Sequence, residues 1–190
     1  YKRQNGDLAA SFFTKKYDRV ILKPAEFKVS DTEISTAIKE ADSSFLNAIK
    51  QAKKNIETFQ RKILPHSAII KKKGIILKHI FKPVAVVGIY IPGGKFSYPS
   101  TILMTAIPAL VAGVKNVILC SPPSFHGTIA PEILATAKEC NISQIYKIGG
   151  VQAIAAMAFG TETIPPVQKI IGPGNKWVNA AKQLLSNVVA

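Results

Sequence analysis

The chain has 190 residues, of which 47% are hydrophobic and 19% charged, and its formal net charge is +14. This length can bury a hydrophobic core in one domain or two small ones. No segment has the roughly 18 uninterrupted apolar residues of a membrane span, and no apolar stretch of a secretory signal follows the first basic residues. The two cysteines, Cys120 and Cys140, are too few for a disulfide framework. We therefore expect a soluble, cytoplasmic protein without membrane contact, with both thiols reduced.

The positive charge lies mostly in the first half of the chain. Residues 1–89 hold 18 Lys and Arg against 8 Asp and Glu, whereas residues 90–190 hold 7 against 3. A basic surface of this kind can contact nucleic-acid phosphates, so a nucleic-acid-binding module is one hypothesis. No aromatic residues interleave with the lysines as a stacking platform would require, which favours a solvated, lysine-rich face instead.

Residues 1–82 are predicted to form a helical region. Apolar residues at helical spacing indicate a helix over residues 8–17. Ser30, followed three residues later by Glu33, is a capping-box pattern that predicts the start of a second helix. We expect this region to form part of the first domain.

A third helix and a hairpin complete that region. Along residues 43–64, apolar side chains recur in steps of four and three, at Phe45, Ile49, Ala52, Ile56, Phe59 and Ile63. This stripe predicts a core-facing seam, with an oligomer contact as the alternative. Residues 68–81, AIIKKKGIILKHIF, predict a hairpin that turns at Lys73 and Gly74, with its four lysines in water.

Residues 83–190 alternate four times between an apolar strand and a helix. The strand segments are VAVVGIYI, NVILC, QIYKI and VQKIIG, and Ser100 is predicted to cap the first of the helices. The loops between strand and helix are residues 92–99, 121–128, 149–150 and 172–175. This order predicts an α/β fold, in which the helical region is followed by a parallel-sheet, Rossmann-like nucleotide-binding domain over 83–190.

The four loops are expected at one edge of the sheet, where ligands bind to such folds. Three of them carry paired or nearly paired glycines, which would let a ligand approach the backbone near helix N-termini. Tyr90, Gln152 and Asn175 have polar groups that should face this edge. The alternatives are a half-buried strand tyrosine, an exposed helix glutamine and a plain N-cap. Because G-x-G-x-x-G and G-x-x-x-x-G-K-[ST] are both absent, the pattern predicts only a nucleotide-like ligand.

Neither a metal site nor a catalytic group is evident in the sequence. The histidines have no metal-ligand spacing with Cys, Asp or Glu. They are His66, His79 and His126. The carboxylates of residues 90–190 are Glu132, Glu139 and Glu162, and none is an obvious general base.

Four long motifs resemble the histidinol dehydrogenase family. They are VGIYIPGG, ILMTAIPALVAGVKNVILCSPP, IYKIGGVQAIAAMAFGTETIP and KIIGPGNKWVNAAK, in this order and spacing within residues 83–182. Upstream, NGDLAASFFTKKYD, KVSDTEI and KKNIETFQ also resemble the family's N-terminal part. The resemblance therefore covers nearly the whole chain.

The resemblance implies a zinc-dependent, homodimeric enzyme that uses NAD to oxidise L-histidinol through an aldehyde to L-histidine. By motif, the family's NAD contacts fall on Tyr90, Gln152 and Asn175. The family's zinc ligands, substrate contacts and catalytic Glu-His pair are expected beyond Ala190, so this chain looks like the N-terminal half and should be inactive alone. A related α/β NAD oxidoreductase with another substrate remains an alternative.

Overall fold

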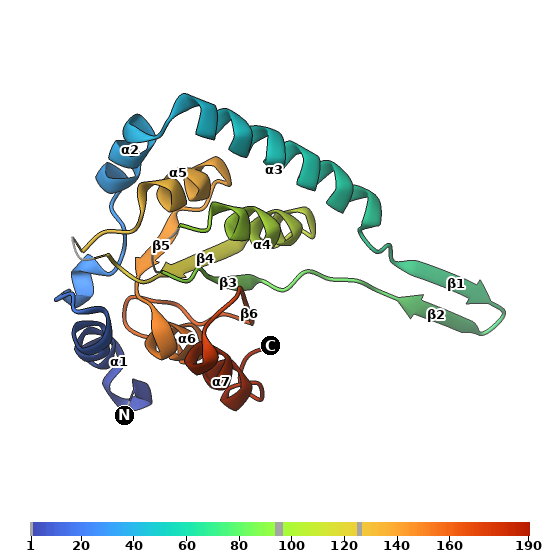
Figure 1. The fold of residues 1–190 in the computed structure, drawn as a ribbon. Coiled ribbons are helices and arrows are strands. Elements are labelled where there is room, and N and C mark those ends of the chain that lie inside the picture. The colour runs from blue at the N-terminus through green and yellow to red at the C-terminus, as the bar shows by residue number, and fades with distance from the viewer. Residues whose placement is uncertain (1, 94–96, 125–126) are drawn as a thin grey trace.

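The computed structural model describes residues 2–93, 97–124 and 127–190. Its centre is a parallel sheet of strand order β5-β4-β3-β6 (Figure 1). The strands are β3 (Val86–Tyr90), β4 (Asn116–Ser121), β5 (Gln144–Lys147) and β6 (Lys169–Ile171). The helices that follow them are α4 (Pro99–Val111), α5 (Pro131–Glu139), α6 (Gly150–Phe159) and α7 (Lys176–Leu184). The predicted α/β fold with a parallel sheet is confirmed.

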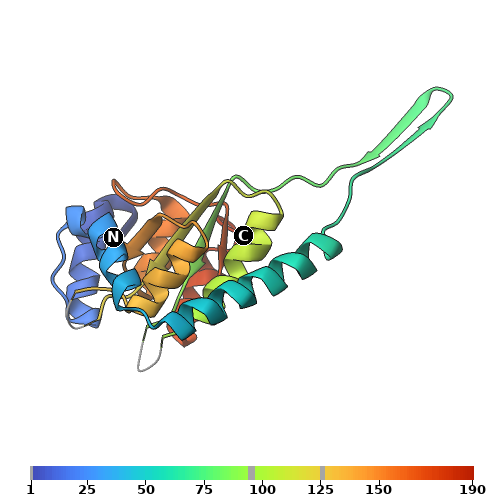
Figure 2. The same cartoon turned by 90° about the horizontal axis from the view of Figure 1, so that it is seen from above.

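Helices cover both faces of the sheet (Figure 1 and Figure 2). On one face, α2 (Asp31–Glu40) and α3 (Ser43–Ile63) pack outside α4 and α5, and on the other face α1 (Lys2–Phe13) packs against α6, which contacts α7. Successive strand residues point to opposite faces. Accordingly Leu119 joins the core under α4 and α5, whereas Ile118 and Cys120 join the core under α6 and α7.

The segment before α2 covers the free edge of β5. The Val29 N–H donates to the Ile145 carbonyl at 2.8 Å, and the Lys147 N–H donates to the Phe27 carbonyl at 2.7 Å. Lys147 is 7% exposed, and its Nζ lies 2.9 Å from Glu33 Oε1 on α2. Because an open strand edge can pair with other chains, this segment protects the sheet on that side.

The first helix differs from the prediction over residues 8–17. Helix α1 spans Lys2–Phe13, with a non-helical backbone at Gly6 (φ 43°), and a π-helix, η1, follows at Thr14–Asp18. Apolar spacing identifies the buried side of a helix, but it does not show where i→i−5 hydrogen bonds replace i→i−4 bonds. A short 3₁₀ helix, η2 (Pro24–Glu26), then leads toward α2.

Of the two helix starts that were predicted from capping residues, one is confirmed and the other is wrong. Ser30 and Glu33 form the expected capping box of α2, because the Glu33 N–H donates to Ser30 Oγ (3.2 Å) and the Ser30 N–H donates to Glu33 Oε2 (2.9 Å). The prediction that Ser100 caps a helix is wrong. Helix α4 begins at Pro99, and its N-cap, Tyr98, makes no side-chain capping bond. Proline suits this position because it has no N–H to satisfy.

The apolar stripe of α3 belongs to the core only along its first part. Ile49 is buried, and the other members packed against the same core are Phe45, Ala52 and Ile56. Phe59 and Ile63 are 59% and 54% exposed. The core-facing interpretation therefore holds for the beginning of the helix.

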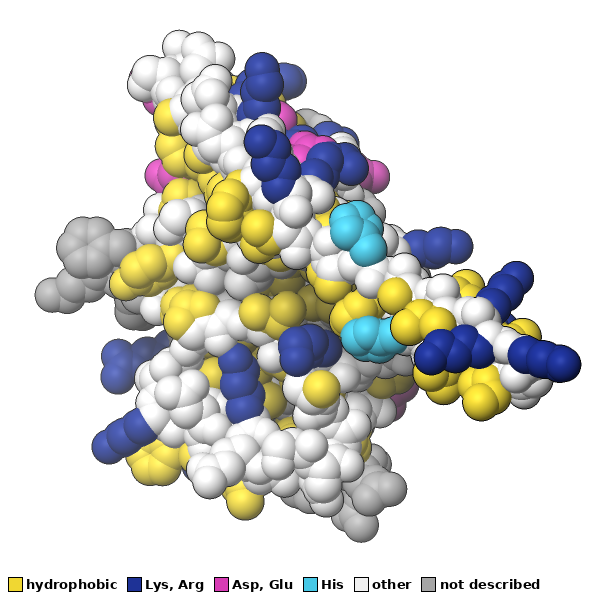
Figure 3. All heavy atoms as spheres, turned by 90° about the vertical axis from the view of Figure 1, so that its right-hand side faces the viewer, with side chains coloured by type: hydrophobic (Ala, Val, Ile, Leu, Met, Phe, Trp, Pro, Cys, Tyr) yellow, Lys and Arg dark blue, Asp and Glu magenta, His cyan; other side chains and the backbone are white. Residues whose placement is uncertain are grey.

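The hairpin forms as predicted but stands away from the rest of the molecule. Strands β1 (Ala68–Lys72) and β2 (Ile75–His79) pair antiparallel around a turn at Lys73 and Gly74. All residues of both strands are exposed, and the hairpin projects outward in Figure 1 and Figure 2. Figure 3, seen from this end, shows hydrophobic side chains interspersed with lysines.

Three further expectations concern the cysteines, a membrane span and the domain boundary. Cys120 and Cys140 are both free and buried, and burial raises the pKa of Cys140 to about 11. Within the described ranges, no helix has the length and apolar character needed to cross a bilayer. The division of the chain at residues 82 and 83 stays a prediction.

We expect Glu33→Gln to lower the free energy of unfolding by about 2 kcal/mol, because it leaves the buried Lys147 ammonium without its counter-charge. Urea unfolding followed by circular dichroism measures the change. The matched control is Glu57→Gln, which breaks the exposed 2.6 Å ion pair with Arg61 and should cost less than about 0.5 kcal/mol. Equal effects of the two variants would contradict the importance of the buried pair.

Candidate functional site: a pocket at the carboxyl edge of the sheet

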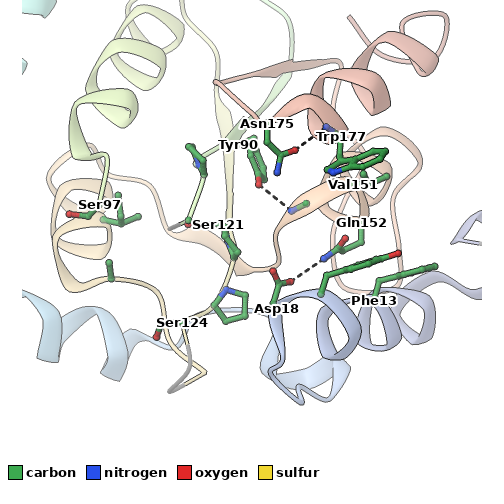
Figure 4. A pocket seen from close by; sticks show the side chains of 18 of the residues that line it. Phe13, Asp18, Tyr90, Ser97, Ser121, Ser124, Val151, Gln152, Asn175 and Trp177 are labelled. Carbon is green, nitrogen blue, oxygen red and sulfur yellow. Dashed lines mark hydrogen bonds between the residues drawn. The ribbon is translucent and has the colours of Figure 1, made fainter. Parts of the chain in front are cut away.

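A cavity of about 1260 Å³ opens where the strands end and the following helices begin. From β3 the chain continues to β4 and β5 on one side of the sheet and then crosses back to β6 on the other side of β3, so the strand order reverses between β3 and β6. The cavity is lined from all four strand-to-helix loops and from the π-helix (Figure 4). Tyr90, Gln152 and Asn175 all lie in its wall.

Tyr90 ends β3 and is 4% exposed. Its Oη accepts a hydrogen bond from the Gly150 N–H at 3.1 Å, which joins the end of β3 to the start of α6. Burial raises the pKa of Tyr90, so the phenol keeps its proton at neutral pH. Since the oxygen is already an acceptor for Gly150, the hydroxyl proton is the group that Tyr90 can offer to a ligand.

Gln152 is not the exposed helix residue that the alternative interpretation describes, because it is 2% exposed. Its Nε2 donates to Asp18 Oδ2 at 3.0 Å (Figure 4). Asp18 is the last residue of the π-helix and lies 134 positions away in the chain. Asp18 was not among the predicted site residues, because neither a motif nor a residue spacing connects FFTKKYD with the loop that precedes α6.

Asn175 is the N-cap of α7, which the alternative to a cofactor contact predicted. Its Oδ1 accepts hydrogen bonds from the N–H groups of Trp177 and Val178, both at 3.0 Å. The amide nitrogen is therefore the part of the side chain that remains for a ligand. Trp177 is 63% exposed beside it and forms an aromatic border of the cavity.

The glycines of the loops have a packing role that was not predicted. At Gly172 (φ +123°) a Cβ atom would lie 2.1 Å from the Tyr90 carbonyl oxygen, and at Gly149 it would lie 2.3 Å from Pro122 Cβ. At these two positions, the lack of a side chain lets two segments of the protein pack closely. The sequence predicted that the loop glycines would instead let a ligand approach the backbone. Gly94 lies outside the described residues.

Helices α4, α5 and α6 all begin at this edge without a side-chain capping bond. The first N–H groups of a helix have no acceptor within the helix, and the helix dipole places partial positive charge there. An anionic group is therefore favoured at the cavity. At α7 the side chain of Asn175 already accepts two of these bonds.

Few titratable side chains are found among the described residues that line the cavity. Among its described lining residues, the carboxylates are Asp18 and Glu132, and no histidine is present. The part of the chain that the structure describes has no group of three or more His, Cys, Asp or Glu side chains able to hold a metal ion. Zinc therefore does not fit these residues.

The sheet, the two helical layers and the pocket at the strand-order reversal define a Rossmann-like α/β protein with a cavity at the carboxyl edge of the sheet. A family model described as histidinol dehydrogenase matches residues 2–190. The chain belongs to the histidinol dehydrogenase family.

Individual relatives agree with this assignment. A histidinol dehydrogenase of Bacillus cereus is 46% identical over 98% of this chain and 43% of its own length, and one of Methanosarcina mazei is 45% identical over the same shares. The crystal structure of histidinol dehydrogenase from Elizabethkingia anophelis superposes with a TM-score of 0.92 at 45% identity, covering 97% of this chain and 42% of that one. The chain thus spans less than half the length of these relatives.

We expect Gly172→Ala to destabilise the fold by more than about 2 kcal/mol, because the new Cβ would collide with a backbone oxygen at an unfavourable φ. Gly74→Ala is the matched control, since Gly74 also has positive φ (+75°) but has nothing within 4 Å of the added atom; its cost should stay near 1 kcal/mol. Chemical unfolding measures both. A loss at Gly172 no larger than at Gly74 would show that contact with Tyr90 is unimportant.

Proposed function

We propose that the pocket binds NAD⁺ and that this chain supplies the cofactor site of a histidinol dehydrogenase, an enzyme that oxidises L-histidinol through L-histidinaldehyde to L-histidine. The main support is the convergence of Tyr90, Gln152 and Asn175, from three separate strand ends, on one large cavity. Family membership supports the choice of reaction.

The groups around the cavity fit a dinucleotide. The starts of α4, α5 and α6 have no side-chain N-cap, so their partial positive charge would favour a diphosphate; at α6 the N–H of Gly150 is already bonded to Tyr90, and any donor must come from the residues after it. The Tyr90 hydroxyl and the Asn175 amide nitrogen offer further donors, and the exposed ring of Trp177 offers a stacking surface for a base. When bound, NAD⁺ would accept the hydride from the substrate. The residues of this chain would hold and orient it.

Zinc, substrate selection and proton transfer are proposed to depend on residues outside this chain. The described residues provide no metal-ligating group of three or more side chains, and no step through zinc is assigned to them. The family resemblance implies a homodimer, a cytoplasmic location and histidinol as the substrate. We propose these three properties for the full-length protein. A different substrate on the same cofactor site remains the alternative, because the substrate contacts are expected elsewhere.

Titration with NAD⁺ tests the cofactor site. Trp177 is the single tryptophan of the chain and borders the cavity, so its fluorescence should change as NAD⁺ binds and the change should saturate. We expect Asn175→Ala to weaken binding by about 1 kcal/mol, roughly fivefold, since one ligand hydrogen bond and a helix cap are lost.

Asp42→Ala is the matched control. Asp42 caps α3 in the same way, with Oδ1 accepting from the Ser44 and Phe45 N–H groups at 2.6 and 3.2 Å, but it does not line the cavity. It should lower stability by about 1 kcal/mol and leave NAD⁺ affinity unchanged. A fluorescence signal that never saturates, or equal affinities of wild type and Asn175→Ala, would contradict the proposed site.

We also expect the 190-residue chain to lack histidinol oxidation. Incubation with L-histidinol, NAD⁺ and Zn²⁺ should give no NADH absorbance, because neither a metal-ligand cluster nor a histidine faces the cavity among the described residues. A full-length relative assayed in parallel should form NADH. Histidinol-dependent NADH formation by the 190-residue chain would contradict this prediction.

A further inference from the structure

Asp18 and Gln152 form a polar contact between the π-helix and α6 at the floor of the cavity. Gln152 is 2% exposed, and its Nε2 donates to Asp18 Oδ2 at 3.0 Å. Both residues line the cavity, and in Figure 4 their side chains point toward one another from opposite elements. The family motif draws attention to Gln152 but says nothing of its partner.

The chemistry of this pair sets the orientation of the Gln152 amide. An ionised carboxylate can only accept hydrogen bonds, whereas a primary amide can present either its nitrogen or its oxygen. Ionised Asp18 therefore holds Nε2 toward itself and leaves Oε1 on the other side. That oxygen would lie 2.9 Å from a Cβ placed on Gly150, so the absence of a side chain at Gly150 leaves room for it.

We propose that Asp18 is a positioning residue of the cofactor site: it fixes the amide of Gln152 so that Oε1 accepts a hydrogen bond from a donor group of the dinucleotide, such as a ribose hydroxyl. This inference rests on the proposed binding of NAD⁺. Asp18 acts through Gln152, and the pair makes Gln152 an acceptor beside the donors supplied by Tyr90 and Asn175.

The backbone around Asp18 is built to hold it in place. The π-helix ends at Asp18, and the next residue, Arg19, has a left-handed backbone (φ 59°), which is uncommon for a residue with a side chain. Within the same segment, the rings of Phe13 and Tyr17 stack with their planes 5° apart. Asp18 thus lies between a π-helix and a left-handed turn residue, directly after a pair of stacked aromatic rings.

The protonation state of Asp18 determines which end of the Gln152 amide faces the Asp18 carboxyl group. Burial raises its pKa to about 6, although the bond from Gln152 lowers it in part. Below that pH the protonated carboxyl can donate to Oε1 and reverse the amide. The charged or titratable residues nearest to it in the chain are Lys15, Lys16, Tyr17 and Arg19, and those that line the same cavity from other elements are Tyr90 on β3 and Glu132 on α5. Among the described residues, none forms an ion pair with Asp18.

A double-mutant cycle tests whether Asp18 acts through Gln152. The affinity for NAD⁺ is measured from Trp177 fluorescence for wild type, Asp18→Ala, Gln152→Ala and the double variant. Each single change should weaken binding about tenfold, and the double variant should be no weaker than Gln152→Ala, because a positioning residue has no effect once its target is gone. Additive losses would mean that Asp18 touches the ligand directly, and they would overturn the proposal.

The pH dependence gives a second readout that a merely structural residue would not change. Wild-type affinity should fall several-fold between about pH 7.5 and about pH 5, as Asp18 takes up a proton. The affinity of Gln152→Ala should stay nearly level over this range. A wild-type affinity that does not change with pH, or an equal fall in Gln152→Ala, would contradict the proposal.

Asp18→Asn separates positioning from folding. Because burial disfavours the charged form, this variant should resist urea at least as well as wild type, yet bind NAD⁺ more weakly at about pH 7.5 and without pH dependence. The matched control is Asp31→Asn, at an exposed carboxylate in the first turn of α2 that does not line the cavity. If wild type binds NAD⁺ but Asp18→Asn binds equally well, the role of Asp18 fails. If wild type itself does not bind, the proposed function fails and the inference fails with it.

Discussion

The burial of both faces of the parallel sheet is the constraint on which the rest of the structure depends. Strands β3, β4 and β5 send alternate side chains into two separate apolar cores, so a helical layer is required on each face. Hydrogen-bonding groups that must reach a ligand are then restricted to the ends of the strands. The crowding of polar side chains at the carboxyl edge follows from the way in which the sheet is covered.

The polar residues at that edge are held by protein contacts before any ligand arrives. Tyr90 accepts from Gly150, Asn175 accepts from the start of α7, and Gln152 donates to Asp18. Each residue thus uses one side of its polar group within the protein and keeps the other for the cavity. Such preorganisation lowers the entropic cost of ordering side chains when a ligand binds. It also distinguishes this edge from an ordinary set of connecting loops.

Local sequence signals predicted the strands, the sheet type and three cavity residues, because apolar runs and β-α alternation depend on neighbouring positions. They failed where distant contacts decide. Asp18 lies at the cavity because α1 packs on α6. The helix predicted over residues 8–17 changes from an α-helix to a π-helix at Thr14, which the apolar spacing does not indicate. Ser100 was chosen as a cap on composition, although Pro99 already begins the helix. The loop glycines were predicted to let a ligand approach the backbone. Their packing role was not predicted, because the contacts with Tyr90 and Pro122 form only when the chain folds.

The exposed β1–β2 hairpin has a consequence for the behaviour of the chain in concentrated solution. Its strands carry Ile69, Ile70, Ile75, Ile76 and Leu77, all more than half exposed. Isolated two-stranded ribbons with apolar faces and open edges are templates for further strands, and therefore starting points for aggregation. Lys71, Lys72, Lys73 and Lys78 lie among these residues, and like charges brought together by stacking ribbons repel one another. We therefore expect these lysines to oppose the stacking of one hairpin on another.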